Sequence, residues 1–168
     1  MSRLLAASFA LCALLTTVLA VSAAPPNFSG TWVLDKQKSQ GLRGPMANAD
    51  ITLTVTQDDK QLTVETKYAG GGREMPAQKA TYNLDGSETT AETTGFMAGK
   101  ATYKAKWSND GKTLELQTTI KGSRDGNEFT RTTTEQWELT EGGKVLKIVR
   151  KGEGRNGPFE STLIFNKK

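Results

Sequence analysis

The chain has 168 residues, with 22 Lys and Arg, 18 Asp and Glu, no His and a single Cys. The length allows one domain or two small ones, and the absence of His excludes catalytic triads, Cys-His pairs and His-ligated metal sites. The formal net charge of +4 is spread along the chain without a block of Lys and Arg, so no basic stripe for a nucleic acid is visible.

Residues 1–23 have the features of a cleaved secretory signal peptide. A positive residue opens the segment, an apolar stretch follows, and Val21-Ser22-Ala23 supplies the small residues that a signal peptidase reads. The alternative is an uncleaved membrane anchor, for which the apolar stretch is near the lower length limit. We expect a secreted or periplasmic domain of residues 24–168 that has no membrane contact after cleavage. This domain lacks the only cysteine, Cys12, so we expect no metal and no cofactor in it.

The mature chain predicts about ten strands and no long helix. It is rich in Thr, which favours strands, and apolar side chains alternate with Thr, Lys or Glu in run after run. Turn pairs such as Asp85-Gly86 and Asp110-Gly111 separate the runs. The weakest of the predicted strands, at 87–94, has almost no apolar residue. In chain order, the predicted strands cover 28–34, 50–57, 61–69, 77–84, 87–94, 100–108, 112–121, 128–139, 143–151 and 158–166.

An all-β meander of this length has to protect its edges. Closure into an antiparallel up-and-down β-barrel removes them, and a two-sheet sandwich is the alternative. The chain has few large apolar residues for its length, which favours a barrel because the lumen tolerates polar side chains and water. We therefore predict an up-and-down barrel of about ten strands.

The first predicted strand carries a family resemblance. Its segment Phe28-Ser29-Gly30-Thr31-Trp32 resembles the Gly-x-Trp opening of the calycins, the superfamily of lipocalins and fatty-acid-binding proteins. The run from Trp32 to Ser39 is similar to uncharacterised secreted bacterial proteins of lipocalin-like type. Residues 35–49 are too short and too interrupted by Gly and Pro for the helix-turn-helix lid of fatty-acid-binding proteins. The resemblance therefore implies architecture more than ligand.

The resemblance also implies how the barrel closes. In the family, the Trp of this motif plugs one end of the barrel and packs against a basic side chain from late in the chain. We expect Gly30 and Trp32 to form this plug, with Arg150, or alternatively Lys151, as the cation over the indole ring.

The strand at 128–139 contains the main candidate for ligand recognition. Arg131 and Glu135 share parity with Phe129 and Trp137, so all four side chains are predicted to face the interior. An interior charge needs a counter-ion, water or a ligand, and Arg131 could bind a carboxylate or phosphate. The alternatives are an interior interaction between Arg131 and Glu135, or a bulge that places both in solvent.

Four aromatic side chains fall on the predicted inner faces of their strands. They could line a pocket for an apolar or aromatic ligand, and ordinary core filling is the alternative. These residues are Tyr82, Tyr103, Trp107 and Phe129. The Gly-rich breaks at 70–76 and 95–99 could flank the barrel mouth, with Phe96 and Met97 as an apolar lid.

Three function classes fit these observations. We expect a non-catalytic binding protein for a small, partly apolar molecule, acidic ligands included. The second class is a structural or protein-interaction module with a filled interior. An enzyme is the third and least favoured class, because without His or Cys it would need Glu, Asp, Tyr or Lys for catalysis, and no paired-carboxylate site is visible in the spacing. The oligomeric state does not follow from the sequence.

Overall fold

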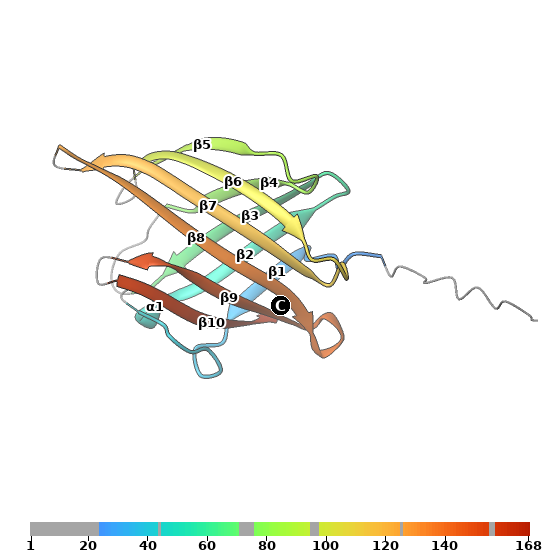
Figure 1. Cartoon of the computed structure of the whole chain (residues 1–168). Coiled ribbons are helices and arrows are strands. Elements are labelled where there is room, and N and C mark those ends of the chain that lie inside the picture. Colours follow the sequence, from blue (N-terminus) through green and yellow to red (C-terminus); the bar gives the residue numbers. More distant parts are fainter. Residues whose placement is uncertain (1–23, 44, 71–75, 95–97, 125, 155–156) are drawn as a thin grey trace, which may run out of the picture.

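A computed structural model of the chain describes residues 24–43, 45–70, 76–94, 98–124, 126–154 and 157–168. Ten antiparallel strands form a single sheet that curls into a nearly closed barrel (Figure 1). All ten predicted strands are confirmed, with bounds shifted by at most three residues. They are β1 Gly30–Leu34, β2 Asp50–Gln57, β3 Gln61–Ala69, β4 Gln78–Asn83, β5 Thr89–Thr93, β6 Gly99–Trp107, β7 Thr113–Arg124, β8 Asn127–Thr140, β9 Val145–Gly154 and β10 Gly157–Lys167.

The strands follow one another around the barrel as a meander. Strands consecutive in the chain pair with each other, except β4 and β5, and β1 pairs with β10, where Trp32 stands opposite Lys167. Apolar residues that alternate in the sequence face the inside of the barrel. On β2, for example, Ile51, Leu53 and Val55 are buried, while the residues between them are more exposed.

The ring is open between β4 and β5, which are the two ends of the sheet order. Within the described residues, no backbone ladder joins these two strands, although the Thr89 hydroxyl donates a hydrogen bond to the Thr81 carbonyl. The strand predicted at 87–94, the weakest in the sequence, is an edge strand of the sheet: among the described strands, β5 pairs only with β6.

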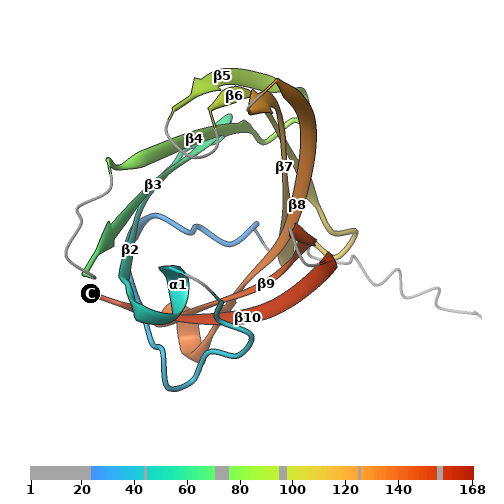
Figure 2. The same cartoon turned by 90° about the vertical axis from the view of Figure 1, so that its left-hand side faces the viewer.

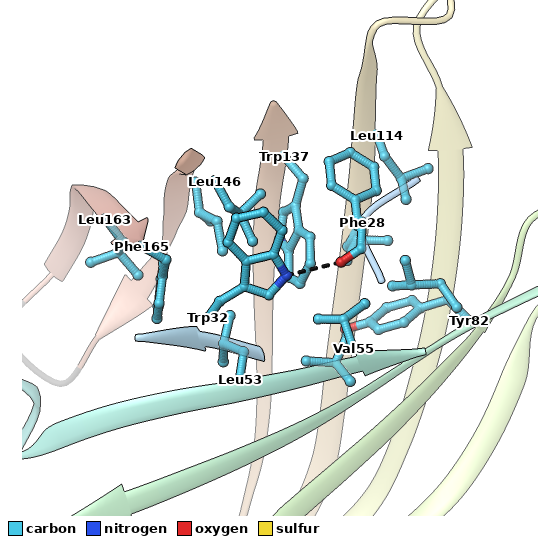
Figure 3. Packing of buried hydrophobic residues seen from close by; sticks show 14 of the residues in the cluster. Phe28, Trp32, Leu53, Val55, Tyr82, Leu114, Trp137, Leu146, Leu163 and Phe165 are labelled. Atoms are coloured by element: carbon cyan, nitrogen blue, oxygen red, sulfur yellow. Dashed lines mark hydrogen bonds between the residues drawn. The ribbon is translucent and has the colours of Figure 1, made fainter. Parts of the chain in front are cut away.

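One end of the barrel is closed by aromatic packing. Phe28 and Trp32 are fully buried, and Trp32 Nε1–H donates a hydrogen bond to the Phe28 carbonyl at 2.9 Å (Figure 3). Phe28 stacks on Trp107 at 6.1 Å between ring centroids and meets Trp137 edge-on at 5.7 Å. In Figure 2, which looks into the opposite end of the barrel, the segment that leads into β1 crosses this closed end.

The cation at this plug is Lys167, which corrects the expectation of Arg150 or Lys151. The Lys167 ammonium lies 5.1 Å from the Trp32 ring centroid. The physical reason is register: β10 is the direct neighbour of β1, whereas Arg150 lies on β9, one strand further away. The Lys167 side chain also passes over Gly30, where an added Cβ would lie 2.9 Å from Lys167 Cε.

The opposite end carries the only described α-helix, the four-residue α1 (Pro45–Asn48) (Figures 1 and 2). This single turn stands in the connection between β1 and β2, where the sequence excludes a helix-turn-helix. Residues before α1 stay attached to β10, since the backbones of Gln40 and Thr162 exchange hydrogen bonds of 2.8 and 3.0 Å. A 3-10 turn, η2 (Glu141–Gly143), joins β8 to β9. No helix among the described residues is both long and apolar enough for a membrane span.

Candidate functional site

A cavity of about 510 Å³ lies inside the barrel. Side chains from α1 and from every strand except β1 line it. This volume lies within the range of 300–1,000 Å³ that is usual for small-molecule sites. The interior is therefore partly hollow, in contrast to the filled barrel of the alternative hypothesis.

Much of the cavity wall is apolar. The aliphatic and aromatic side chains come from strands on both sides of the ring and belong to, or pack against, the hydrophobic core. Figure 3 shows part of this wall, with Leu53, Leu163 and Phe165 close to the Trp32 plug. The apolar lining consists mainly of Met46, Ile51, Leu53, Val64, Ala80, Ile120, Ile148, Leu163 and Phe165. Such a wall suits a ligand with an apolar body.

An ion pair between Arg150 and Glu135 is the polar centre of the cavity. The two residues stand directly opposite each other on β9 and β8. Arg150 Nε–H donates to Glu135 Oε1 at 2.6 Å, and Nη2 lies 2.5 Å from the same oxygen. The side chains are 23% and 15% exposed, so the pair is largely withdrawn from solvent. Burial opposes the charge of Arg150, but the Glu135 carboxylate keeps the pKa of the guanidinium above its ordinary value.

Two further contacts hold this pair in place. Trp137 Nε1–H donates to Glu135 Oε2 at 2.8 Å, so both oxygens of the carboxylate are occupied. Arg150 Nη1 donates to Met46 Sδ at 3.3 Å, which links the cavity centre to α1 at the mouth. The pair is thus a fixed, hydrogen-bonded element of the wall rather than two mobile charges.

Three tyrosines share the polar region. The hydroxyls of Tyr82 and Thr118 are hydrogen-bonded at 2.9 Å, and the Tyr82 and Tyr103 rings meet edge-on at 5.3 Å. Burial raises the pKa of Tyr82, of Tyr68 and of Tyr103, and the nearby Glu135 carboxylate adds to the effect at Tyr82 and Tyr68. All three tyrosines therefore face the cavity as neutral hydrogen-bonding groups.

The structure brings together three of the six residues predicted for the lumen. Glu135, Tyr82 and Tyr103 line the cavity. Trp107 does not, because it packs on Phe28 at the closed end, as the alternative of core filling had it. Whether any of these residues binds a ligand remains a prediction.

Arg131 and Phe129 lie outside the cavity lining, which corrects their predicted place in the lumen. Both share parity with Glu135, and the pairing of β8 with β7 is continuous, so no bulge is involved. The cause is the length of the strand: β8 pairs with β9 only from Thr133 onward, so its first part extends beyond the closed ring. In this part of β8 the Arg131 guanidinium is half-buried and lies 5.9 Å from the centroid of the Phe129 ring. Arg131 is therefore not a charge buried inside the barrel, and it does not pay the desolvation cost of one. The loop residues Phe96 and Met97, expected as a lid, lie outside the described residues.

Sequence reasoning missed Arg150, Tyr68, Thr118 and Met46 as cavity residues. A signal for Arg150 was present, since it shares parity with the buried Leu146 and Ile148 on β9. Nothing comparable marked Met46, which reaches the cavity from a single helical turn. Within the described ranges, no group of three or more His, Cys, Asp or Glu side chains could hold a metal ion.

Comparison with known proteins shows likeness in fold alone. No protein-family model matches the chain, and a search of curated proteins finds no match. Among solved structures, a zebrafish ileal bile acid-binding protein complexed with cholic acid matches with a TM-score of 0.56 and 14% identity, over 84% of this chain and 98% of that one. The REP1-NXSQ fatty acid transporter matches with a TM-score of 0.54 and 14% identity, over 83% of this chain and 95% of that one. The chain is thus a ten-stranded barrel with neighbours of the fatty-acid-binding-protein type.

Proposed function

We propose that this protein binds a small, partly apolar molecule inside its barrel and performs no chemistry on it. The observation that carries the proposal is the cavity of about 510 Å³, whose apolar wall surrounds one fixed polar centre. Such a combination buries an apolar body and orients it through a few polar contacts. The fold neighbours, named as a fatty acid transporter and a bile acid-binding protein, agree with this proposal.

The second candidate is a structural or interaction module that works through its outer surface. It expects a filled interior, and the hollow interior of the described barrel speaks against it. A catalytic role finds no support either, because the single buried carboxylate of the cavity, Glu135, is bound on both oxygens by Arg150 and Trp137. A general acid or base needs a free position toward its substrate.

We further propose that residues 24–168 act outside the cytoplasm, in the periplasm or the extracellular space. The support is the signal-peptide pattern of residues 1–23. Edman sequencing of the protein recovered from its exporting host tests this directly, with Ala24 expected as the first residue.

Binding is tested by titrating the purified mature protein with Nile red, an uncharged dye whose fluorescence rises in apolar surroundings. We expect saturable binding that is lost in Ala80→Trp, because Ala80 lines the cavity and the larger side chain fills it. The matched control is Thr54→Trp, on the exposed outer face of β2, which should bind like the wild type. Absence of dye binding by the folded wild type, or equal binding by all three proteins, would overturn the proposal.

A further inference from the structure

The charges that line the cavity cancel one another. Four charged side chains contribute to the lining: Glu135 and Arg150 at its centre, and Lys79 and Glu92 on exposed positions of β4 and β5. The two central charges are bound to each other at 2.5–2.6 Å. The inner cation of the described lining, Arg150, is therefore already paired with a carboxylate, whereas Lys79 lies on an exposed position of β4.

We infer that the ligand of this cavity is uncharged, and that Glu135 excludes carboxylate ligands by occupying Arg150. This inference rests on the proposed function and specifies its ligand class: a molecule with an apolar body and a neutral polar group such as a hydroxyl or carbonyl. A ligand carboxylate would have to displace Glu135 from Arg150, or lie beside it as a second negative charge in a space withdrawn from water. Both arrangements are unfavourable.

The geometry makes displacement of Glu135 costly. Its Oε1 accepts a hydrogen bond from Arg150, and its Oε2 accepts one from Trp137 Nε1–H at 2.8 Å. A ligand carboxylate that took its place at Arg150 would leave Glu135 without its cation, and Trp137 Nε1–H would lose its acceptor if Glu135 moved away. The backbone also fixes the pair, because Glu135 and Arg150 are register partners on adjacent strands. The carboxylate is thus a permanent counter-ion that belongs to the wall.

Neutral polar groups, in contrast, find partners in the cavity. Tyr68 and Tyr103 line it, and among the described residues neither hydroxyl has a hydrogen bond. A hydroxyl both donates and accepts, so these two tyrosines can bind an alcohol or a carbonyl without a net charge on the ligand. The apolar side chains of the rest of the lining can surround the body of such a ligand.

The test compares three probes with one chain length: decanol, methyl decanoate and decanoate, at a pH at which decanoic acid is ionised. Each competes with Nile red on the mature protein. We expect the alcohol and the ester to displace the dye at concentrations at least tenfold lower than decanoate. In Glu135→Gln, Arg150 loses its counter-ion, and we expect decanoate to gain at least tenfold while the alcohol changes little.

Glu138→Gln is the matched control. It removes one negative charge from the same strand, but Glu138 lies in an exposed pair with Lys147, 3.8 Å apart. This variant should keep the wild-type order of the three probes. The wild-type comparison requires no variant, so the inference stays testable even if Glu135→Gln fails to fold.

Each outcome separates the inference from the proposed function. Decanoate that displaces the dye as well as decanol does in the wild type would overturn the inference and leave the proposed function standing. A folded Glu135→Gln variant without gain for decanoate would also overturn it. Failure of the folded wild type to bind the dye and all three probes would overturn the proposed function itself.

Discussion

The ammonium of Lys167 lies 5.1 Å from the centre of the Trp32 ring, and the two residues are register partners on β10 and β1. One contact therefore joins the strands at which the meander closes. It also covers the indole that plugs this end of the barrel, and the Nε1–H of the same indole donates a hydrogen bond to the Phe28 carbonyl.

Lys167→Ala should lower the free energy of unfolding by about 0.5–1 kcal/mol, since an exposed cation over an indole contributes about this much. Urea unfolding followed by Trp fluorescence measures it. Lys168→Ala removes the same charge from the next residue and should leave the midpoint within experimental error. Equal losses in the two variants would show that net charge, and not the contact with Trp32, is responsible.

Gly30→Ala should be destabilising by about 1–3 kcal/mol because of backbone strain. Gly30 has a φ of +143°, and a Cβ there would lie 2.9 Å from Lys167 Cε. Gly111→Ala is the comparison, because that residue also has a positive φ (+68°) but nothing within 4 Å of the added carbon. Differential scanning calorimetry of both variants separates the conformational cost from the close approach, and Gly30→Ala should have the lower Tm.

Arg150→Met should cost about 3 kcal/mol of stability, because it leaves Glu135 buried without its counter-ion. Chemical denaturation of Arg150→Met and of Arg150→Met/Glu135→Gln provides the check, and the second change should restore most of the loss. Lys147→Met breaks the exposed pair with Glu138 on the same two strands, and about 0–1 kcal/mol is expected there. A double variant as unstable as Arg150→Met alone would contradict the role given to the buried pair.

All three tyrosines of the chain should ionise at higher pH in the folded protein than in guanidinium. Burial raises the pKa of Tyr68, Tyr82 and Tyr103 above their ordinary value of 10.0. The folded state therefore binds these protons more tightly, so stability is full below pH 10 and declines as the pH rises above it. Spectrophotometric titration of tyrosinate in the native and unfolded protein tests this, and a native tyrosine that titrates at its ordinary pH would contradict it.

Acid should destabilise the protein through its turns. Backbone N–H groups of Lys60 and Gln61 lower the pKa of Asp58, and the Ser108 hydroxyl with the Lys112 N–H lowers that of Asp110. Each carboxylate thus stabilises the fold above its ordinary value of 3.8, and this contribution is lost as the pH falls through the lower, folded-state value. Urea midpoints measured down through this range should fall less steeply in Asp58→Asn/Asp110→Asn than in the wild type. Parallel curves would contradict the assignment.

The architecture followed from the sequence because alternation is a local property. Ile51, Leu53 and Val55 mark a wall with one buried face, whichever strands lie beside it. The plug at Trp32 could also be identified, but its cation could not, since that depends on which strand is the neighbour of β1. The alternation along β8 correctly predicted that Glu135 faces the cavity, but the same prediction was wrong for Arg131. Alternation does not show that the first part of β8 extends past the end of its pairing with β9.

The pairing of β1 with β10 has a consequence for the order of folding. Every other ladder joins strands that are consecutive in the described chain, so each can form as a local hairpin. The ladder through Trp32 and Lys167 closes a loop of nearly the whole domain, and its entropic cost is offset only once the strands between them are in place. Closure of the ring is thus expected as a late event. Contacts at this seam should then slow unfolding while leaving the rate of folding almost unchanged.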